Sequence, residues 1–201
     1  MQPGPIVVGI AGPSGSGKTT LARLVAGQLP GGAVVFPLDA YYIDQRGVPD
    51  DVLNVDEPAA FDQPLILDHL KQLLSGVAVQ QPIYDYATHS RAPVRRTVPP
   101  LPNIVVEGIF ALYWPDVRSL FTTSVFLSLD HEVCLERRIE RDFRERTRSR
   151  MTVVYHYERS VRPMYDLHIH PTRAHATLVL DARASSEQLA ARIMRSLATR
   201  I

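Results

Sequence analysis

The feature that most constrains the fold of this chain is a glycine-rich segment near its start, Gly12-Pro13-Ser14-Gly15-Ser16-Gly17-Lys18-Thr19. It has the spacing G-x-x-x-x-G-K-[ST], with a short β-branched run before it and a stretch of helical period after it. Glycines let the backbone turn tightly and aim successive N–H groups at phosphate oxygens, while the helix N-terminus adds partial positive charge. The segment therefore predicts a strand, a phosphate-binding loop and a helix, the alternative being a glycine-rich turn without a ligand.

Two side chains of this loop have expected chemical roles. Lys18 would supply a movable cation for the β- and γ-phosphates, and the Thr19 hydroxyl would ligate Mg²⁺. We therefore expect ATP and Mg²⁺ as cofactors. The nucleotide contacts are expected from Gly12, Ser14, Gly15, Ser16, Gly17, Lys18, Thr19 and Thr20.

Short β-branched runs alternate with longer stretches of helical period, a pattern typical of a parallel sheet wrapped by helices. Strands are expected at residues 6–10, 33–36, 103–106, 125–129 and 177–180, and helices at 18–29, 65–74, 131–148, 153–168 and 185–199. These strands should be buried on both faces because helices cover both. Residues 77–102 contain five prolines and no helical period, which predicts a β-hairpin excursion from the sheet.

Charge and cysteine content limit the partners and the compartment. The 22 Lys and Arg residues nearly cancel the 21 Asp and Glu residues, so no global field gathers a nucleic acid polymer. The single cysteine, Cys134, cannot form an intramolecular disulfide, and the first residues do not resemble a signal peptide. No apolar run approaches the roughly 18 residues that cross a bilayer. We therefore expect a cytoplasmic protein without a nucleic acid or membrane partner.

Acidic residues stand at the ends of two expected strands, where ligands bind in open parallel sheets. Glu107 closes the strand at 103–106 and could reach Mg²⁺ directly or through water. Asp39 follows the strand at 33–36 and could accept a proton from an attacking hydroxyl or help to hold the metal. The alternatives are an ordinary strand-terminal carboxylate for Glu107 and a turn or helix cap for Asp39.

Residues 54–62 and 82–91 lack the apolar rhythm that would explain them as core. In the second segment, Tyr84, Tyr86 and His89 combine flat apolar surface with hydrogen-bonding groups, which suits a nucleobase. Packing within the hairpin is the alternative for the tyrosines.

Seven arginines occur in the fourteen residues 137–150. On a helix, Arg137, Arg141, Arg144 and Arg148 share one face, and Leu135, Ile139 and Phe143 form another face that should pack. Such a run is often a solvated surface with internal ion pairs. Beside a phosphate loop, however, it can neutralise a migrating phosphate and exclude water, so we expect a lid.

Together these patterns predict one α/β domain over residues 1–201, of P-loop NTPase type. It should have a parallel sheet with helices on both faces, a β-hairpin insertion at about 77–102 and an arginine-rich helical lid at about 137–150.

In their order along the chain, these segments resemble the uridine kinase family of pyrimidine ribonucleoside kinases. The matching pieces are the phosphate loop, Asp39-x-Tyr41-Tyr42, Asn54-x-Asp56-x-Pro58-x-Ala60-Phe61-Asp62, Pro82-x-Tyr84-Asp85-Tyr86-x-x-His89-Ser90-Arg91, Glu107-Gly108-Ile109, and the lid segments Arg137-Arg138-x-x-Arg141-Asp142 and Glu145-Arg146-x-Arg148. The resemblance implies that Arg141 faces the transferred phosphate. It also implies that Arg138 joins Asp56 on the ribose hydroxyls, with His156 near the ribose, and that Arg148 joins His89 on the base.

Three positions depart from the family pattern. Thr147 replaces a glycine that is frequent between the last two lid arginines. His156 stands where relatives commonly carry glutamine, and Glu57 replaces a common histidine after the ribose-reading aspartate.

The expected activity is transfer of the γ-phosphoryl group of Mg²⁺-bound ATP to the 5′-hydroxyl of uridine or cytidine, a reaction of pyrimidine salvage. In it Lys18 and Arg141 stabilise phosphate oxygens, and Asp39 orients and deprotonates the hydroxyl. Two alternatives stay open: a P-loop kinase for another small alcohol, such as pantothenate or a sugar phosphate, and a non-catalytic ATP-sensing module. The resemblance also suggests a homo-oligomer. The choice between uridine and cytidine stays open.

Overall fold

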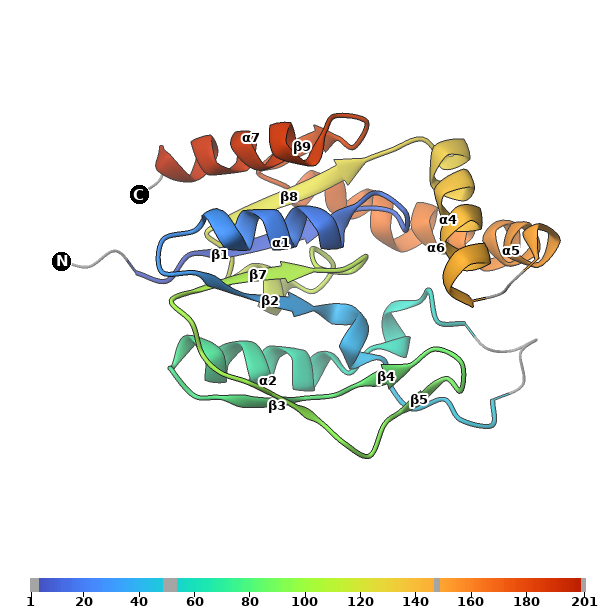
Figure 1. Cartoon of the computed structure of the whole chain (residues 1–201), viewed down its shortest axis with the longest axis horizontal. Helices are drawn as coiled ribbons and strands as arrows, with labels where there is room; N and C mark the ends of the chain where they lie inside the picture. Colours follow the sequence, from blue (N-terminus) through green and yellow to red (C-terminus); the bar gives the residue numbers. More distant parts are fainter. Residues whose placement is uncertain (1–3, 49–53, 147–148, 200–201) are drawn as a thin grey trace.

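A five-stranded parallel sheet forms the centre of the molecule (Figure 1). The structure, a computed structural model, describes residues 4–48, 54–146 and 149–199. The strand order is β2-β7-β1-β8-β9, with bounds β1 Val7–Ala11, β2 Ala33–Pro37, β7 Asn103–Glu107, β8 Thr123–Ser128 and β9 Leu178–Asp181. All four neighbouring pairs run parallel. The predicted α/β class and the five strands are confirmed.

Helices cover both faces of the sheet. On one face lie α1 (Lys18–Gln28) and α7 (Ser186–Ala198), and on the other lies α2 (Gln63–Leu74) (Figure 1). The predicted apolar face of α7 is buried through Leu189, Ile193 and Leu197, and each such side chain stabilises the fold by about 2 kcal/mol. A capping box between Ser185 and Gln188 fixes where α7 begins.

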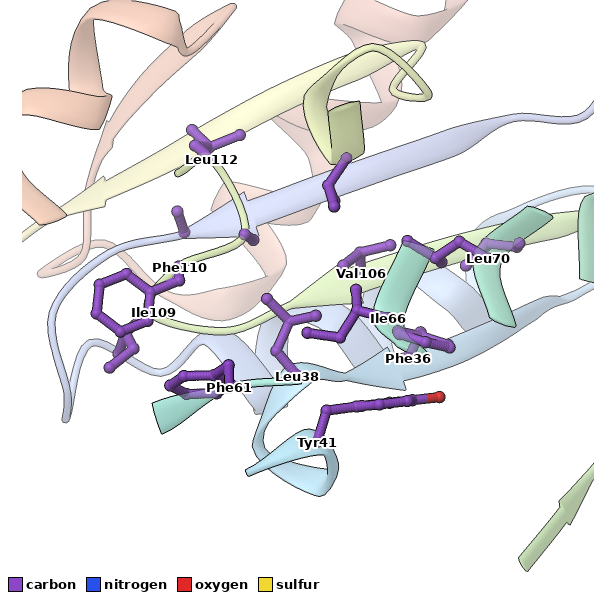
Figure 2. Packing of buried hydrophobic residues seen from close by; sticks show 14 of the residues in the cluster. Phe36, Leu38, Tyr41, Phe61, Ile66, Leu70, Val106, Ile109, Phe110 and Leu112 are labelled. Atoms are coloured by element: carbon purple, nitrogen blue, oxygen red, sulfur yellow. The ribbon is translucent and has the colours of Figure 1, made fainter. Parts of the chain in front are cut away.

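The core on the α2 face holds the largest buried side chains. Figure 2 shows Phe36, Leu38 and Tyr41 beside Ile66 and Leu70 of α2. Every residue of β1 and β7 is buried, as predicted for central strands. The same prediction is wrong for the edge strands, since β2 buries alternate residues and Val179 of β9 is 37% exposed. An edge strand has one neighbour, so helices on both faces do not enclose it fully.

The excursion at 77–102 contains two nested antiparallel pairs. Strand β3 (Val79–Gln81) pairs with β6 (Arg96–Val98), and β4 (Tyr84–Asp85) pairs with β5 (Ser90–Arg91). The pairs lie next to α2 and beyond β2 (Figure 1). Short helical turns complete this side: η1 Leu38–Tyr41, η2 Pro58–Ala60 and, after β7, α3 Pro115–Arg118.

The region after β8 differs from the expectation in two ways. Helix α4 (His131–Arg146) is followed by α5 (Arg150–His156), η3 (Tyr157–Val161), α6 (Arg162–Met164), η4 (Tyr165–Ile169) and η5 (His170–His175). The single α-helix predicted at 153–168 is therefore wrong, because η3 and η4 are wide π-helical turns. Pro163 has no N–H to donate to the preceding turn, which favours such a wide turn before it.

The second difference is the exposure of Phe143 on α4. Ile139 is buried as predicted, but Phe143, one turn further on, is 72% exposed. Helix α4 extends past the carboxyl end of the sheet, so its far part has no sheet to pack against (Figure 1). Among the described helices, none has the length and apolar character that a bilayer crossing requires.

Candidate active site

The phosphate loop joins β1 to α1 by a close backbone approach. A Cβ atom at Gly12 would lie 2.5 Å from the backbone oxygen of Leu127, and φ there is 145°, so only glycine fits. No side chain caps α1 at Gly17, and the first turn carries no acidic residue. The N–H groups at this helix end therefore meet no competing carboxylate, which suits a phosphate.

Lys18 lies inside this loop and not on the surface. Its side chain is buried, and Nζ donates to the Pro13 carbonyl oxygen at 2.8 Å. Burial lowers the pKa of Lys18, while the negative charges of Glu107 and Asp39 act in the opposite direction. The structure thus brings together three of the predicted site residues.

Thr19 and Glu107, the predicted metal ligands, are in contact. The Thr19 hydroxyl donates to Oε1 of Glu107 at 3.0 Å, and Glu107 is the buried last residue of β7. Burial raises the pKa of Glu107, and the charge of Asp39 raises it further. A hydroxyl and a carboxylate are hard oxygen donors that fit Mg²⁺, which usually takes one or two carboxylates and completes its shell with phosphates and water. In the described parts of the chain, no three His, Cys, Asp or Glu residues gather as a ready metal site, so the nucleotide would supply further ligands.

The raised pKa of Glu107 gives a prediction about stability. A carboxyl with a raised folded-state pKa keeps its proton to a higher pH in the folded than in the unfolded chain. The stability of the fold therefore falls as pH rises from the unfolded-state pKa to the folded-state pKa of Glu107. Glu107→Gln should therefore raise the melting temperature of the ligand-free protein at pH 8, and the difference should vanish near pH 4. Thermal unfolding across pH checks this.

The matched control is Glu140→Gln on the exposed surface of α4. It should show no such pH-dependent gain. A Glu107→Gln variant less stable than the wild type at pH 8 would contradict the prediction.

Asp39 is presented by a turn whose neighbours are buried. In η1, Leu38 and Tyr41 are fully buried, whereas Asp39 between them is exposed. Gly108 permits this arrangement, because a Cβ atom there would lie 2.7 Å from Cβ of Leu38. Oδ2 of Asp39 accepts a hydrogen bond from the Tyr86 hydroxyl at 2.9 Å. The carboxylate thus stands between the phosphate loop and the β4–β5 hairpin.

A second cluster of polar side chains surrounds Asp56. Asp56 and Arg138 are both buried, and Arg138 Nη1 donates to the Ser14 hydroxyl of the phosphate loop at 3.3 Å. Burial raises the pKa of Asp56, and the charge of Arg138 opposes that effect. Nε of Arg138 is buried without a hydrogen-bond partner among the described residues. A small cavity beside this group is lined by Pro13, Ser14, Asp56, Ile109, Tyr157, Val161, Tyr165 and Ile169.

In the segment after the lid, Ser160 contacts Asp56, whereas His156, four residues earlier, is exposed. Burial raises the pKa of Asp56 overall. The charge of His156 opposes this rise, as that of Arg138 does, but more weakly than Arg138. Ser160 donates to Oδ1 of Asn54 at 2.9 Å and to Oδ2 of Asp56 at 3.4 Å. Ser160 was not predicted as a site residue, although it stands four residues after His156, at the spacing of one helical turn.

The β4–β5 hairpin carries the residues predicted to face a base. The Tyr84 and Tyr42 rings lie 5.0 Å apart, and those of Tyr84 and Tyr86 lie 5.2 Å apart, so the packing alternative for the tyrosines is observed. The Tyr84 hydroxyl nevertheless has no hydrogen-bond partner in the described part of the chain. His89 adopts a positive φ of 49°, and its carbonyl accepts from the Gln45 N–H at 2.9 Å.

Helix α4 brings arginines to the phosphate loop. Nε and Nη2 of Arg141 both donate to Oδ1 of the buried Asp142 at 3.1 Å, and the charge of Arg141 is among those that act on Lys18. Arg137, for which no individual role was predicted, donates to the Gly15 carbonyl at 3.3 Å. Arg148 and Thr147 lie outside the described residues.

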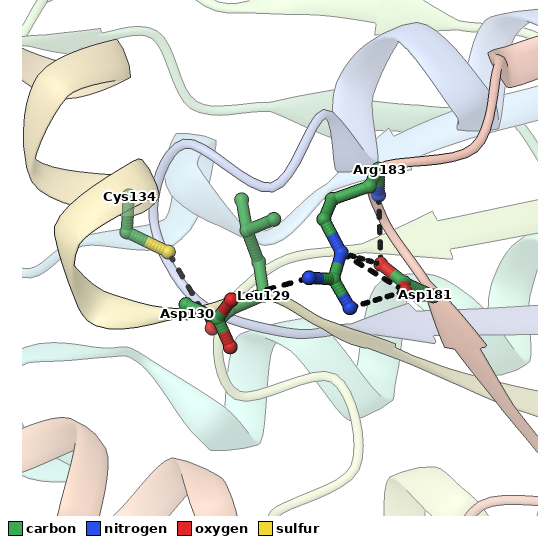
Figure 3. A network of polar contacts seen from close by, with 5 residues as sticks. All are labelled: Leu129, Asp130, Cys134, Asp181 and Arg183. Carbon is green, nitrogen blue, oxygen red and sulfur yellow. Dashed lines mark hydrogen bonds and ion pairs between the residues drawn. The ribbon is translucent and has the colours of Figure 1, made fainter.

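The start of α4 is tied to the end of the sheet. Arg183 donates to Asp181 at 2.7 Å and reaches Asp130 at 3.5 Å, and the Cys134 thiol donates to the Leu129 carbonyl at 3.9 Å (Figure 3). The ion pairs are exposed, so solvent screens them and they contribute little to stability. They connect the turn after β9 to the turn after β8, where α4 begins.

Comparison with known proteins assigns the chain to a family. The model of the Phosphoribulokinase / Uridine kinase family matches residues 7–189. The chain belongs to this family. A uridine kinase from Deinococcus deserti is 42% identical over 180 residues, which are 88% of this chain and 87% of that protein. A uridine kinase from Ligilactobacillus salivarius is 38% identical over 180 residues, with 88% and 84% covered.

Solved structures show the same fold at lower identity. A possible uridine kinase from Bacillus stearothermophilus has a TM-score of 0.59 and 23% identity, with 90% of this chain and 91% of that chain covered. This likeness supports the P-loop kinase fold alone. The uridine kinase family resemblance inferred from the sequence motifs is confirmed by the family match and by the curated relatives.

Proposed function

We propose that this chain transfers the γ-phosphoryl group of ATP to the 5′-hydroxyl of uridine or cytidine. The observation that carries the proposal is the position of Asp39 at the carboxyl end of β2, two residues after Pro37, which pairs with Glu107 of β7. Beside the larger effect of burial, the charge of Asp39 acts on the pKa of Lys18 and Glu107 on one side and of Asp56 on the other. A hydroxyl held near Asp56 would therefore meet Asp39 and the phosphate loop at once.

The phosphate side would bind the nucleotide through the N-terminus of α1 and Lys18. Thr19 and Glu107 would hold Mg²⁺, which when bound offsets the charge of the phosphate oxygens. Asp39 would accept the proton of the 5′-hydroxyl. The hydroxyl oxygen would form a bond to the γ-phosphorus while the bond between the γ-phosphorus and the leaving oxygen of ADP breaks. Arg141 would offset the charge that spreads over the equatorial oxygens in the transition state.

The nucleoside side would bind the ribose and the base separately. Asp56 and Arg138 are a buried acceptor and a buried donor that would bind the ribose hydroxyls, with Ser160 in contact with Asp56 and His156 expected near the ribose. Tyr84 and His89 on the hairpin, together with Arg148, would face the base. Uridine kinases at 38–42% identity support this class of substrate over pantothenate or a sugar phosphate. We also propose a role in pyrimidine salvage in the cytoplasm, as a homo-oligomer.

A coupled assay of ADP release with a panel of acceptors tests the proposal. Uridine and cytidine should both be phosphorylated in the presence of Mg²⁺. Adenosine, pantothenate and a sugar phosphate should give at most background rates. ADP release only when pantothenate or a sugar phosphate is the acceptor would support a P-loop kinase for another small alcohol. ATP binding without turnover on any acceptor would support a non-catalytic ATP-sensing module.

Replacement of His89 tests the base site. His89→Phe keeps a ring but removes both hydrogen-bonding atoms, so kcat/KM for uridine should fall about 10-fold or more while the KM for ATP stays unchanged. Steady-state kinetics with uridine, cytidine and ATP measure this. His175→Phe, at an exposed position before β9, is the control and should change neither value. Unchanged pyrimidine kinetics for His89→Phe would show that the base binds elsewhere.

A further inference from the structure

The β4–β5 hairpin makes a direct contact with Asp39. The Tyr86 hydroxyl donates to Oδ2 at 2.9 Å, although the two residues are 47 positions apart. The Tyr86 ring is held edge-on against Tyr42, with ring centres 6.0 Å apart, and against Tyr84 at 5.2 Å. A carboxylate on an exposed turn can rotate, and this hydrogen bond restricts it while leaving Oδ1 for another partner.

The hairpin is in turn fixed to the turn that carries Asp39. The Arg91 guanidinium donates to the carbonyl oxygens of Tyr42 at 2.7 Å and Tyr41 at 3.1 Å, and to Oδ2 of Asp62 at 3.0 Å. Its side chain is only 21% exposed. One arginine thus uses three donors on three acceptors, a fork that lysine cannot reproduce.

Asp62 links the same contact to α2. Its Oδ1 accepts from the Leu65 N–H at 3.2 Å and caps α2, while Oδ2 accepts from Arg91. A backbone hydrogen bond from the Gln45 N–H to the His89 carbonyl joins the hairpin to the segment after Asp39 a second time. The hairpin, the Asp39 turn and the start of α2 therefore form one connected unit.

We propose that Tyr86 and Arg91 are positioning residues for Asp39, so that the hairpin predicted to recognise the base also sets the angle of the carboxylate. This inference rests on the proposed function. The Tyr86 hydroxyl fixes the carboxylate directly, and Arg91 fixes the distance between the hairpin and the backbone that carries it. A base seated against Tyr84 and His89 would press on the element that orients Asp39, so correct binding and correct orientation are coupled.

Tyr86→Phe is the decisive variant because it keeps the ring packing. It should lower kcat with uridine about 10-fold, the loss typical of one hydrogen bond to a charged group, without changing the KM for ATP or the melting temperature. Tyr113→Phe, a half-buried tyrosine after β7, is the control and should keep wild-type kcat. Arg91→Lys should also lower kcat with the KM for ATP unchanged.

A double-mutant cycle separates positioning from general structure. Once Asp39→Asn has removed the group being positioned, adding Tyr86→Phe should cause no further loss of kcat. A full 10-fold loss in that background, or a wild-type kcat for Tyr86→Phe alone, would overturn the inference. Wild-type turnover in the Asp39→Asn variant itself would instead overturn the proposed role of Asp39, so the two failures are distinguishable.

Discussion

Replacing Asp39 by asparagine should lower kcat by roughly 10²- to 10⁴-fold, the range for loss of a positioned general base. The substitution keeps the shape of the side chain and an oxygen that can still accept from Tyr86, but it removes the ability to take up a proton. Leu38 and Tyr41 anchor the turn from within the core, so its backbone should not move. ATP affinity should change little, because Lys18 and the α1 N-terminus are intact.

The measurements are kcat at saturating uridine and ATP affinity by direct titration. Asp68→Asn is the matched control, since Asp68 lies on the exposed face of α2 and accepts a hydrogen bond from Gln72 at 2.8 Å. It should leave kcat close to the wild-type value. Wild-type turnover in Asp39→Asn would show that Asp39 has only a structural role in its turn. A loss of ATP affinity without a loss of kcat would show that Asp39 acts in nucleotide binding.

The local patterns of the sequence predicted much of this fold. The phosphate loop, the five strands and α1, α2, α4 and α7 lie within a few residues of the predicted ranges, because glycine spacing and apolar period are properties of short segments. The burial of Ile139 and the exposure of Phe143 show the limit of that reasoning. Periodicity identifies the apolar face of a helix, but only the position of the helix beside the sheet decides how far along that face is covered.

The contacts that organise the candidate site were harder to predict for the same reason. Tyr86 meets Asp39 across 47 positions, and Arg91 meets Tyr41 across 50. Neither contact has a local signal, because the nested pairing of β3 with β6 and of β4 with β5 creates it. Thr19 and Glu107, by contrast, were predicted as a pair, since the carboxyl ends of parallel strands share one edge of the sheet.

Arg141→Ala should lower kcat by about 10³-fold or more, the effect of removing an arginine that offsets transition-state charge in phosphoryl transfer. Two of its donor groups are held by Oδ1 of Asp142, which is 1% exposed, so the guanidinium is already oriented before a ligand binds. Burial is the main cause of the lowered pKa of Lys18, and the charge of Arg141 acts in the same direction as a smaller effect. We therefore expect Arg141 to act on the same phosphates as Lys18. Prior orientation of this kind favours the transition state over the bound nucleotide.

Steady-state kinetics distinguish the two kinds of contact. A transition-state contact predicts a loss in kcat with a nearly constant KM for ATP, whereas a rise in that KM alone would make Arg141 a ground-state phosphate contact. Arg192→Ala, at an exposed position of α7, is the control and should cost less than 2-fold, within the usual range for a surface substitution. Arg141→Lys should recover little of the loss, because a point charge on a flexible stem cannot keep the two-donor contact with Asp142 that orients the guanidinium.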